Sequence, residues 1–163
     1  MKVAITGHSA GIGQALTRVF ESNGHEIVGL SRRNGYNIRS LPKIAGQIEP
    51  CDMLINNAQV GFAQTELLFE IWRRWEGQEK TIVNISTQMT DLLVPPKREW
   101  DEYIIQKKAL ELAEELLTER NVWPRQLMVR PGAIATQPGQ TPPEYMDVDV
   151  YAQGVYKWIV KSI

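Results

Sequence analysis

The stretch Lys2-Val3-Ala4-Ile5-Thr6-Gly7-His8-Ser9-Ala10-Gly11-Ile12-Gly13 decides the fold of this chain. Lys2 to Ile5 is typical of a short buried strand, Thr6 to Gly13 of a glycine loop, and helical spacing begins at Ile12. A strand, a glycine loop and a helix in this order can bind phosphate, because the glycines let the backbone approach an anion that the helix start faces. Similar loops occur in purely structural turns, so the loop alone favours nucleotide binding and a simple turn about equally.

The composition predicts one globular domain, residues 1–163, and excludes several classes of partner. Hydrophobic residues make up 43% and charged residues 23% of the 163 positions, which is ordinary for a globular protein. A net charge of -1 without a basic run argues against nucleic acid as the main partner. The lone Cys51 cannot form an internal disulfide and has no companions at metal-ligand spacing, so no metal site is predicted. No apolar run is long enough for a membrane span and no signal peptide is expected, which favours a cytoplasmic protein without a membrane partner.

The segment after the glycine loop completes a βαβ unit. Asn23-Gly24 is a favoured helix end, and His25 to Ser31 is typical of a second strand. One helix face between the two strands is apolar, with Ala15, Leu16, Val19 and Phe20. Because βαβ units are parallel and right-handed, this arrangement puts the glycine loop at the carboxyl end of the sheet, where ligands of open α/β sheets bind.

Strands and helices alternate along the rest of the chain. Further strands are predicted at 36–38, 53–56, 81–85 and 127–129, and further helices at 41–48, 64–75, 99–120 and 148–163. A loop rich in proline, glycine and threonine is predicted from Thr136 to Pro143. The pattern predicts the α/β class: a Rossmann-like, doubly wound parallel sheet flanked by helices in three α/β/α layers.

Arg32 and Arg33 directly follow the second strand, where dinucleotide-binding folds meet the adenosine ribose. An acidic residue at this position binds the ribose 2′-hydroxyl, whereas an arginine accommodates a 2′-phosphate. The sequence Ser31-Arg32-Arg33 contains no acid, so NADP(H) is favoured over NAD(H). The alternative is a pair of solvated surface arginines.

Tyr103 and Lys107 lie four residues apart on the longest predicted helix and therefore share one face. A lysine ammonium near a tyrosine favours the phenolate and lowers the pKa of the hydroxyl from about 10. Such a pair suits general acid–base chemistry on an alcohol or carbonyl oxygen. By themselves, however, a tyrosine and a lysine at this spacing are more often structural.

Five motifs occur in one order along the chain and together carry a specific resemblance. They are Thr6-Gly7-x-x-x-Gly11-Ile12-Gly13, Asn56-Asn57-Ala58, Asn84-Ile85-Ser86-Thr87, Tyr103-x-x-x-Lys107 and Pro131-Gly132-x-x-x-Thr136. In this order they resemble the short-chain dehydrogenase/reductase superfamily, from the first strand to about Thr136. The chain would be an unusually short member.

The resemblance implies a cofactor site at the carboxyl ends of the strands. The glycine loop would hold the pyrophosphate, lined by Gly7, His8, Ser9, Gly11, Ile12 and Gly13. The adenosine end would meet Arg32, Arg33, Asn37, Ile38, Asn57 and Ala58. The nicotinamide end would meet Tyr103, Lys107, Pro131, Gly132, Ile134 and Thr136.

The resemblance also implies catalytic roles. Tyr103 would protonate the carbonyl oxygen, and Lys107 would tune Tyr103. Thr87 stands where the family commonly has the serine that polarises the substrate, with Ser86 as the alternative. No asparagine between Asn57 and Ser86 matches the one that commonly supports the proton relay, and little chain follows Thr136. A reduced substrate lid and a reduced C-terminal strand are therefore predicted.

The sequence is compatible with two functions. The first is an NADP(H)-dependent oxidoreductase that acts on a small carbonyl or alcohol substrate. The second is an NADP(H)-binding sensor or interaction module with little or no turnover. By analogy with the family, a homodimer through the helices at 64–75 and 99–120 is also possible.

Overall fold

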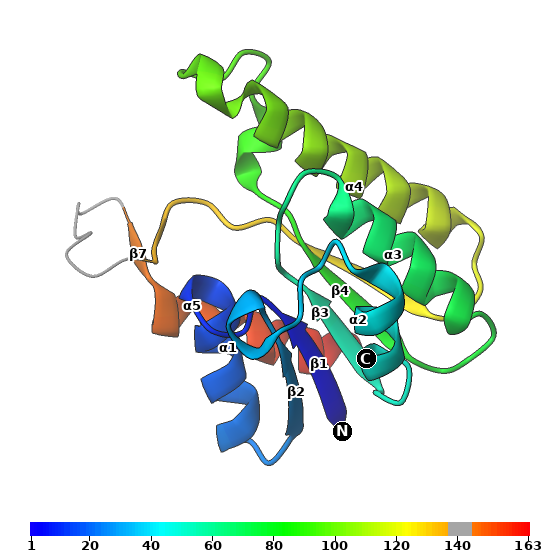
Figure 1. Ribbon diagram of the computed structural model, residues 1–163. Helices are drawn as coiled ribbons and strands as arrows, with labels where there is room; N and C mark the ends of the chain where they lie inside the picture. The colour runs from blue at the N-terminus through cyan, green and yellow to red at the C-terminus, as the bar shows by residue number, and fades with distance from the viewer. Residues whose placement is uncertain (137–144) are drawn as a thin grey trace.

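Five parallel strands form the central sheet of the computed structural model, which describes residues 1–136 and 145–163 (Figure 1). Their order across the sheet is β2-β1-β3-β4-β5. The strands are β1 (Lys2–Thr6), β2 (Glu26–Leu30), β3 (Met53–Asn56), β4 (Thr81–Ile85) and β5 (Arg125–Val129). The chain reverses its direction of progress across the sheet between β1 and β3, and such a switch point is where open α/β sheets bind ligands.

Helices cover both faces of the sheet (Figure 1). One face carries α1 (Gly11–Ser22) and α5 (Val148–Ser162), and the other carries α2 (Leu41–Ile48), α3 (Ala63–Arg74) and α4 (Asp101–Glu119). Side chains alternate along β1 accordingly, because Val3 and Ile5 pack with α1 and α5 while Ala4 packs on the opposite face. The predicted doubly wound, three-layer α/β/α class is therefore confirmed.

The predicted third strand at 36–38 is wrong. The Tyr36 N–H donates to the Ser31 carbonyl at 2.8 Å, and the Asn37 carbonyl accepts the Ser40 N–H at 2.8 Å. A short 3₁₀ turn, η1 (Arg32–Asn34), precedes this segment and ends at Gly35 with φ of 84°. These local bonds use the backbone groups that a strand would offer to a neighbour, so the segment forms a turn.

The segment after β5 adds no strand to the main sheet within the described residues, in line with the predicted reduction of the C-terminal strand. Within residues 1–136 and 145–163, the main sheet ends at β5. Two two-residue strands, β6 (Ile134–Ala135) and β7 (Met146–Asp147), pair with each other instead. Of the loop predicted from Thr136 to Pro143, residues 137–143 lie outside the described residues.

Two short 3₁₀ turns lie between β4 and α4, namely η2 (Gln88–Asp91) and η3 (Arg98–Trp100). Because η3 occupies the residues just before Asp101, the long helix begins slightly later than the predicted Glu99. None of the helices in the described part of the chain has the length and apolar character needed to cross a membrane.

Candidate functional site

The glycine loop between β1 and α1 is closed by close backbone packing. A Cβ atom on Gly13 would lie 2.3 Å from the Gly7 carbonyl oxygen, and one on Gly7 would lie 2.9 Å from the Asn57 amide nitrogen. Gly7 also adopts a φ of 70°. Close contacts therefore require glycine at both positions, and the positive φ is a second reason for glycine at position 7.

The end of β3 is tied to this loop by hydrogen bonds. The Thr6 hydroxyl accepts the N–H groups of Asn57 at 2.9 Å and Ala58 at 3.0 Å. The Asn57 side-chain amide donates to the Thr6 carbonyl at 2.9 Å. Two of the five motifs, far apart in the sequence, thus form one rigid platform at the switch point of the sheet.

The N-terminus of α1 is open to an anion. Its N-cap residue, Ala10, supplies no side-chain cap, and the first turn contains no acidic residue. The first N–H groups of a helix have no partner within the helix, so they remain available to a ligand here. Free N–H groups and the helix dipole together favour a phosphate at this point.

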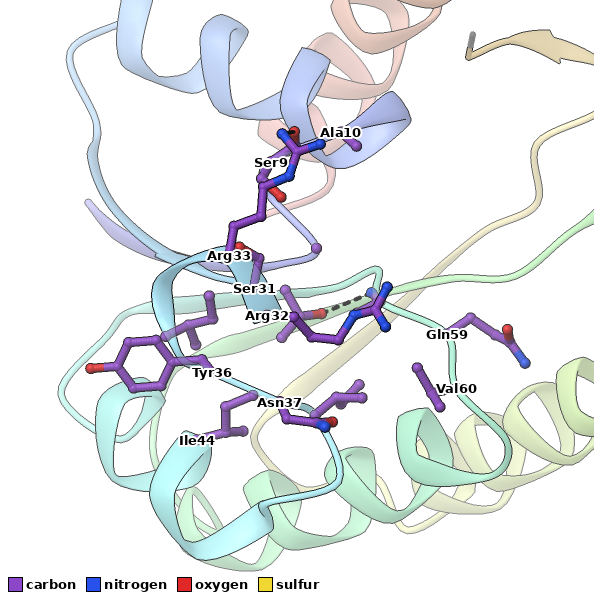
Figure 2. A pocket seen from close by; sticks show the side chains of 15 residues that line it. Ser9, Ala10, Ser31, Arg32, Arg33, Tyr36, Asn37, Ile44, Gln59 and Val60 are labelled. Atoms are coloured by element: carbon purple, nitrogen blue, oxygen red, sulfur yellow. Dashed lines mark hydrogen bonds between the residues drawn. The ribbon is translucent and has the colours of Figure 1, made fainter.

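A cavity of about 310 Å³ lies beside the glycine loop and is called the arginine cavity here (Figure 2). Arg32 and Arg33 leave the end of β2 in different directions along it (Figure 2). Arg33 donates to the Ser9 carbonyl at 3.3 Å, whereas Arg32 extends toward Gln59. The lining residues are Thr6, Gly7, Ser9, Ala10, Leu30, Ser31, Arg32, Arg33, Tyr36, Asn37, Ile38, Ile44, Ala58, Gln59 and Val60.

The turn that carries both arginines is fixed by its own side chains. The Ser31 N–H donates to the Asn34 carboxamide oxygen at 2.9 Å, and the Asn34 amide donates to the Gly29 carbonyl at 2.7 Å. His8 has a separate role, because its ring lies over Gly29, where a Cβ would approach it to 2.5 Å. His8, Gly11 and Gly13 are the predicted cofactor residues that line neither cavity of the site.

A second cavity of about 590 Å³ lies on the other side of the switch point and is called the tyrosine cavity. It brings together the β4 end, the start of α4 and the segment after β5. Its lining residues are Ile12, Asn57, Gln59, Ile85, Ser86, Thr87, Gln88, Met89, Leu92, Trp100, Tyr103, Lys107, Pro131, Gly132, Ala133, Ile134, Thr136 and Tyr145. All four predicted catalytic residues and all four predicted residues of the 131–136 turn are among them.

Tyr103 and Thr87 meet in the tyrosine cavity. Burial raises the pKa of the Tyr103 hydroxyl, and a hydrogen bond with Thr87 opposes this rise by a smaller amount. The expectation that Lys107 lowers the pKa of Tyr103 is not met. Tyr103 is thus protonated at neutral pH, which suits a proton donor.

Ser86 is bound to a cluster of charged side chains. Its hydroxyl donates to Glu111 Oε1 at 2.5 Å. The same carboxylate oxygen accepts from Thr90 at 2.8 Å and from Arg130 Nε at 3.1 Å. Arg130 also pairs with Asp91 at 2.5 Å. Of the two candidate hydroxyls, that of Ser86 is bound to Glu111, whereas that of Thr87 accepts the Met89 N–H at 3.3 Å and helps to hold down the pKa of Tyr103.

Lys107 is held by acceptors beneath the cavity. Its ammonium donates to Gln64 Oε1 at 2.8 Å and to the Ile85 carbonyl at 2.7 Å, and it lies 5.7 Å from the centre of the Tyr103 ring. The Lys107 side chain is only 3% exposed. Burial lowers its pKa to about 8, an effect that the nearby Glu111 carboxylate partly opposes.

The amide of Gln64 has a fixed orientation. Its nitrogen donates to the Asn56 carbonyl at 2.6 Å and to the Ile85 carbonyl at 3.0 Å, so its oxygen is left to accept from Lys107. Asn56 in turn donates to the Gln64 carbonyl at 2.9 Å and to Asn84 at 3.0 Å. A connected polar network thus supports the lysine.

Sequence reasoning missed three residues of this site: Gln64, Glu111 and Gln59. A signal existed for the first two. Gln64 lies one turn before Leu67 and Leu68, on the buried face of its helix, and Glu111 lies one turn after Lys107. Gln59 lines both cavities and donates to Gln106 on α4, a contact that no spacing rule indicates.

Comparison with known proteins identifies a related family model and related folds. The model of the NAD dependent epimerase/dehydratase family matches residues 3–70, which hold the glycine loop, both arginines and the end of β3. No curated protein sequence matches the chain significantly.

Solved structures match almost the whole chain. The bulky-bulky ketone specific alcohol dehydrogenase from Comamonas testosteroni aligns with a TM-score of 0.76 and 20% identity, over 98% of this chain and 82% of that one. A short chain dehydrogenase from Burkholderia cenocepacia, in complex with NADP, gives 0.75 and 17% over 97% and 83%. A short chain dehydrogenase/reductase from Burkholderia phymatum, in complex with NAD, gives 0.73 and 17% over 98% and 85%. The resemblance to short-chain dehydrogenases/reductases is confirmed as a shared fold.

Proposed function

We propose that this chain is an NADP(H)-dependent oxidoreductase of the short-chain dehydrogenase/reductase type, built as a single dinucleotide-binding domain. It would interconvert a carbonyl group and an alcohol, with Tyr103 as the acid and base. The observation that carries the proposal is the tyrosine cavity, which Tyr103, Lys107 and Thr87 line together with residues of the 131–136 turn. An oxidoreductase is also the class to which the structural neighbours belong by name.

The residues present fit a dinucleotide. The uncapped start of α1 offers N–H groups to a pyrophosphate, and glycine at position 13 lets the loop pack closely against Gly7 and Asn57. The arginine cavity would hold the adenosine end, with Arg32 and Arg33 beside the ribose 2′-position. Neighbouring structures contain NADP in one case and NAD in another, so the preference for NADP(H) rests on these arginines.

When bound, the nicotinamide would supply or accept the hydride. The Tyr103 hydroxyl, protonated at neutral pH, would give its proton to the carbonyl oxygen, and Thr87 would donate a hydrogen bond to the same oxygen. Lys107, held by Gln64 and Ile85, would face the ribose and keep a positive field behind Tyr103. The oxidation direction needs the phenolate, so it would be favoured at higher pH.

Turnover by the purified chain is the direct test. NADPH oxidation is measured by absorbance with a panel of aldehydes, ketones and quinones, and NADPH binding is measured in parallel by fluorescence. Tyr103→Phe should lower kcat about 100-fold to 10,000-fold, the usual contribution of a general acid, and should leave the NADPH dissociation constant nearly unchanged.

Two results would contradict the proposal. Binding of NADPH without oxidation by any member of the panel would favour a sensor or interaction module. Undiminished kcat in Tyr103→Phe would remove Tyr103 from the reaction. Ile105→Phe is a suitable control, because Ile105 lies on α4 but is exposed and away from the cavity.

A further inference from the structure

The substrate side of the tyrosine cavity has an apolar and aromatic wall. Leu92 and Tyr145 are 41% and 40% exposed, so they line its open side rather than the core. Trp100 stands three residues before Tyr103, at the entry of α4, and therefore lies on the same side of the chain as the reactive hydroxyl. Met89 and Ile134 extend this apolar surface.

Lys107 is the only charged side chain among the described residues that line this cavity, and its ammonium already has two acceptors within the chain. It donates to Gln64 Oε1 at 2.8 Å and to the Ile85 carbonyl at 2.7 Å. An anionic substrate would have to compete with these fixed, buried acceptors for the ammonium.

Two neighbouring cations, Arg130 and Lys97, already have partners. Arg130 pairs with Glu111 at 3.1 Å and with Asp91 at 2.5 Å. Lys97 lies 5.1 Å from the centre of the Trp100 ring, at the rim. In the described part of the site, therefore, the wall offers a substrate hydroxyl, amide and apolar groups rather than a free cation.

We infer that the tyrosine cavity accepts uncharged carbonyl compounds with an aromatic or aliphatic substituent, or the matching alcohols, and rejects keto acids and phosphorylated substrates. The inference rests on the proposed function. A carboxylate placed against this wall loses its water without gaining a cationic partner, which weakens its binding. An apolar substituent gains by covering Leu92 and Trp100 while the carbonyl oxygen reaches Tyr103 and Thr87.

The test compares three substrates that share one reacting group: benzaldehyde, 4-carboxybenzaldehyde and methyl 4-formylbenzoate. The methyl ester is larger than the acid but uncharged, so it separates the effect of charge from that of size. With NADPH saturating, kcat/KM for the ester should exceed that for the acid about 100-fold, the scale expected for an unpaired carboxylate in a partly buried site.

A variant pair then tests the wall itself. Leu92→Arg adds a cation inside the cavity and should raise the acid-to-ester ratio of kcat/KM about tenfold, the scale of one charge-assisted hydrogen bond. Leu93→Arg is the matched control, because Leu93 is 95% exposed and outside this cavity, and it should leave the ratio unchanged.

The outcomes separate this inference from the proposed function. Equal kcat/KM for acid and ester, or a preference for the acid, would overturn the inference and leave the oxidoreductase standing. NADPH oxidation with none of the three aldehydes nor with the wider panel would overturn the proposed function, and the inference with it.

Discussion

The two cavities lie at the same edge of the sheet but are built in opposite ways. The platform beside the arginine cavity depends on the absence of side chains, since a Cβ on Gly13 would lie 2.3 Å from the Gly7 carbonyl oxygen. The tyrosine cavity depends on buried side chains, since Lys107 is 3% exposed and held by two acceptors. In the proposed function, backbone geometry would serve binding on one side, and shifted protonation equilibria would serve chemistry on the other.

The charges follow the same division. Arg32 and Arg33 are exposed, so folding does not remove them from water before a ligand binds. Lys107 and Glu111 are buried or half-buried, and each already has partners within the chain. Substitutions on the first side should therefore act on cofactor affinity, and those on the second side on turnover and on pH dependence.

The largest expected effect on cofactor binding is at the glycine platform. Gly13→Ala forces a methyl group against the Gly7 carbonyl and the Asn57 amide, so the loop must open. Overpacking of this kind costs about 1–3 kcal/mol of stability, and displacement of the N–H groups should weaken NADPH binding at least about 100-fold. Thermal unfolding and NADPH titration measure the two effects.

Gly46→Ala is the matched control for this substitution. Gly46 lies within α2, and a Cβ there would have no heavy atom within 4 Å. The change should raise stability by about 0.5–1 kcal/mol, the difference in helix propensity, and leave NADPH affinity unaltered. Equal affinities for NADPH in both variants would show that the glycine loop is only a structural turn.

The next effect concerns Lys107, which is buried, and the way in which the free energy of unfolding depends on pH. Its pKa falls from 10.5 to about 8 on folding, so between these values the unfolded chain binds more protons than the native one. The contribution of Lys107 to stability should therefore rise as the pH increases from about 8 to 10.5, by an amount on the order of 3 kcal/mol. Below pH 8 both states are protonated, and this contribution is constant.

Lys107→Met isolates that contribution. Burial raises the pKa of the Cys51 thiol to about 11 and also raises the pKa of the Tyr103 and Tyr151 hydroxyls. These groups act in the opposite direction, so the slope of the wild type alone mixes several contributions. Urea unfolding of wild type and variant at several pH values between 7 and 10.5 gives the difference directly. If the free energy of unfolding had the same pH dependence in both proteins, the pKa of Lys107 would not be lowered on folding.

The contrast between the cavities also explains what the sequence could predict. The glycine loop, Arg32 and the Tyr103–Lys107 pair follow local rules of spacing, because each motif is made by neighbours along one element. The support of Lys107 comes from Gln64, 43 positions away, and only folding brings the two together. The predicted strand at 36–38 is wrong because Tyr36 donates to the Ser31 carbonyl and Ser40 donates to the Asn37 carbonyl, and these local bonds form a turn.

Substitution of Gln64 tests that long-range contact, and we expect its effect on kcat to be intermediate in size. Gln64→Leu removes the acceptor from Lys107 and leaves its ammonium with one fixed partner, Ile85. We expect kcat to fall about 10-fold to 100-fold, the scale of a lost hydrogen bond to a charged group, with a smaller change in NADPH affinity.

A purely structural role for Gln64 is distinguished by the pH profile of kcat. Gln64→Glu should move the alkaline limb to higher pH, because a carboxylate beside Lys107 favours its charged form. Gln47→Leu on the exposed side of α2 is the control. An unshifted profile in Gln64→Glu, despite a folded protein, would assign Gln64 to packing alone.

The smallest expected effect is on the exposed arginines, where solvent screens the charge. Arg32→Ala should weaken NADPH binding about tenfold, the scale of one charge-assisted hydrogen bond to a phosphate, and should leave NADH binding nearly unchanged. The difference should shrink at high salt, because an exposed pair is screened. Arg39→Ala is the control, since Arg39 is exposed but does not line the arginine cavity. If Arg32→Ala weakened NADPH and NADH binding equally, Arg32 would support the cavity and would not recognise the 2′-phosphate. The difference in charge between the two cavities would then be unrelated to the choice of cofactor.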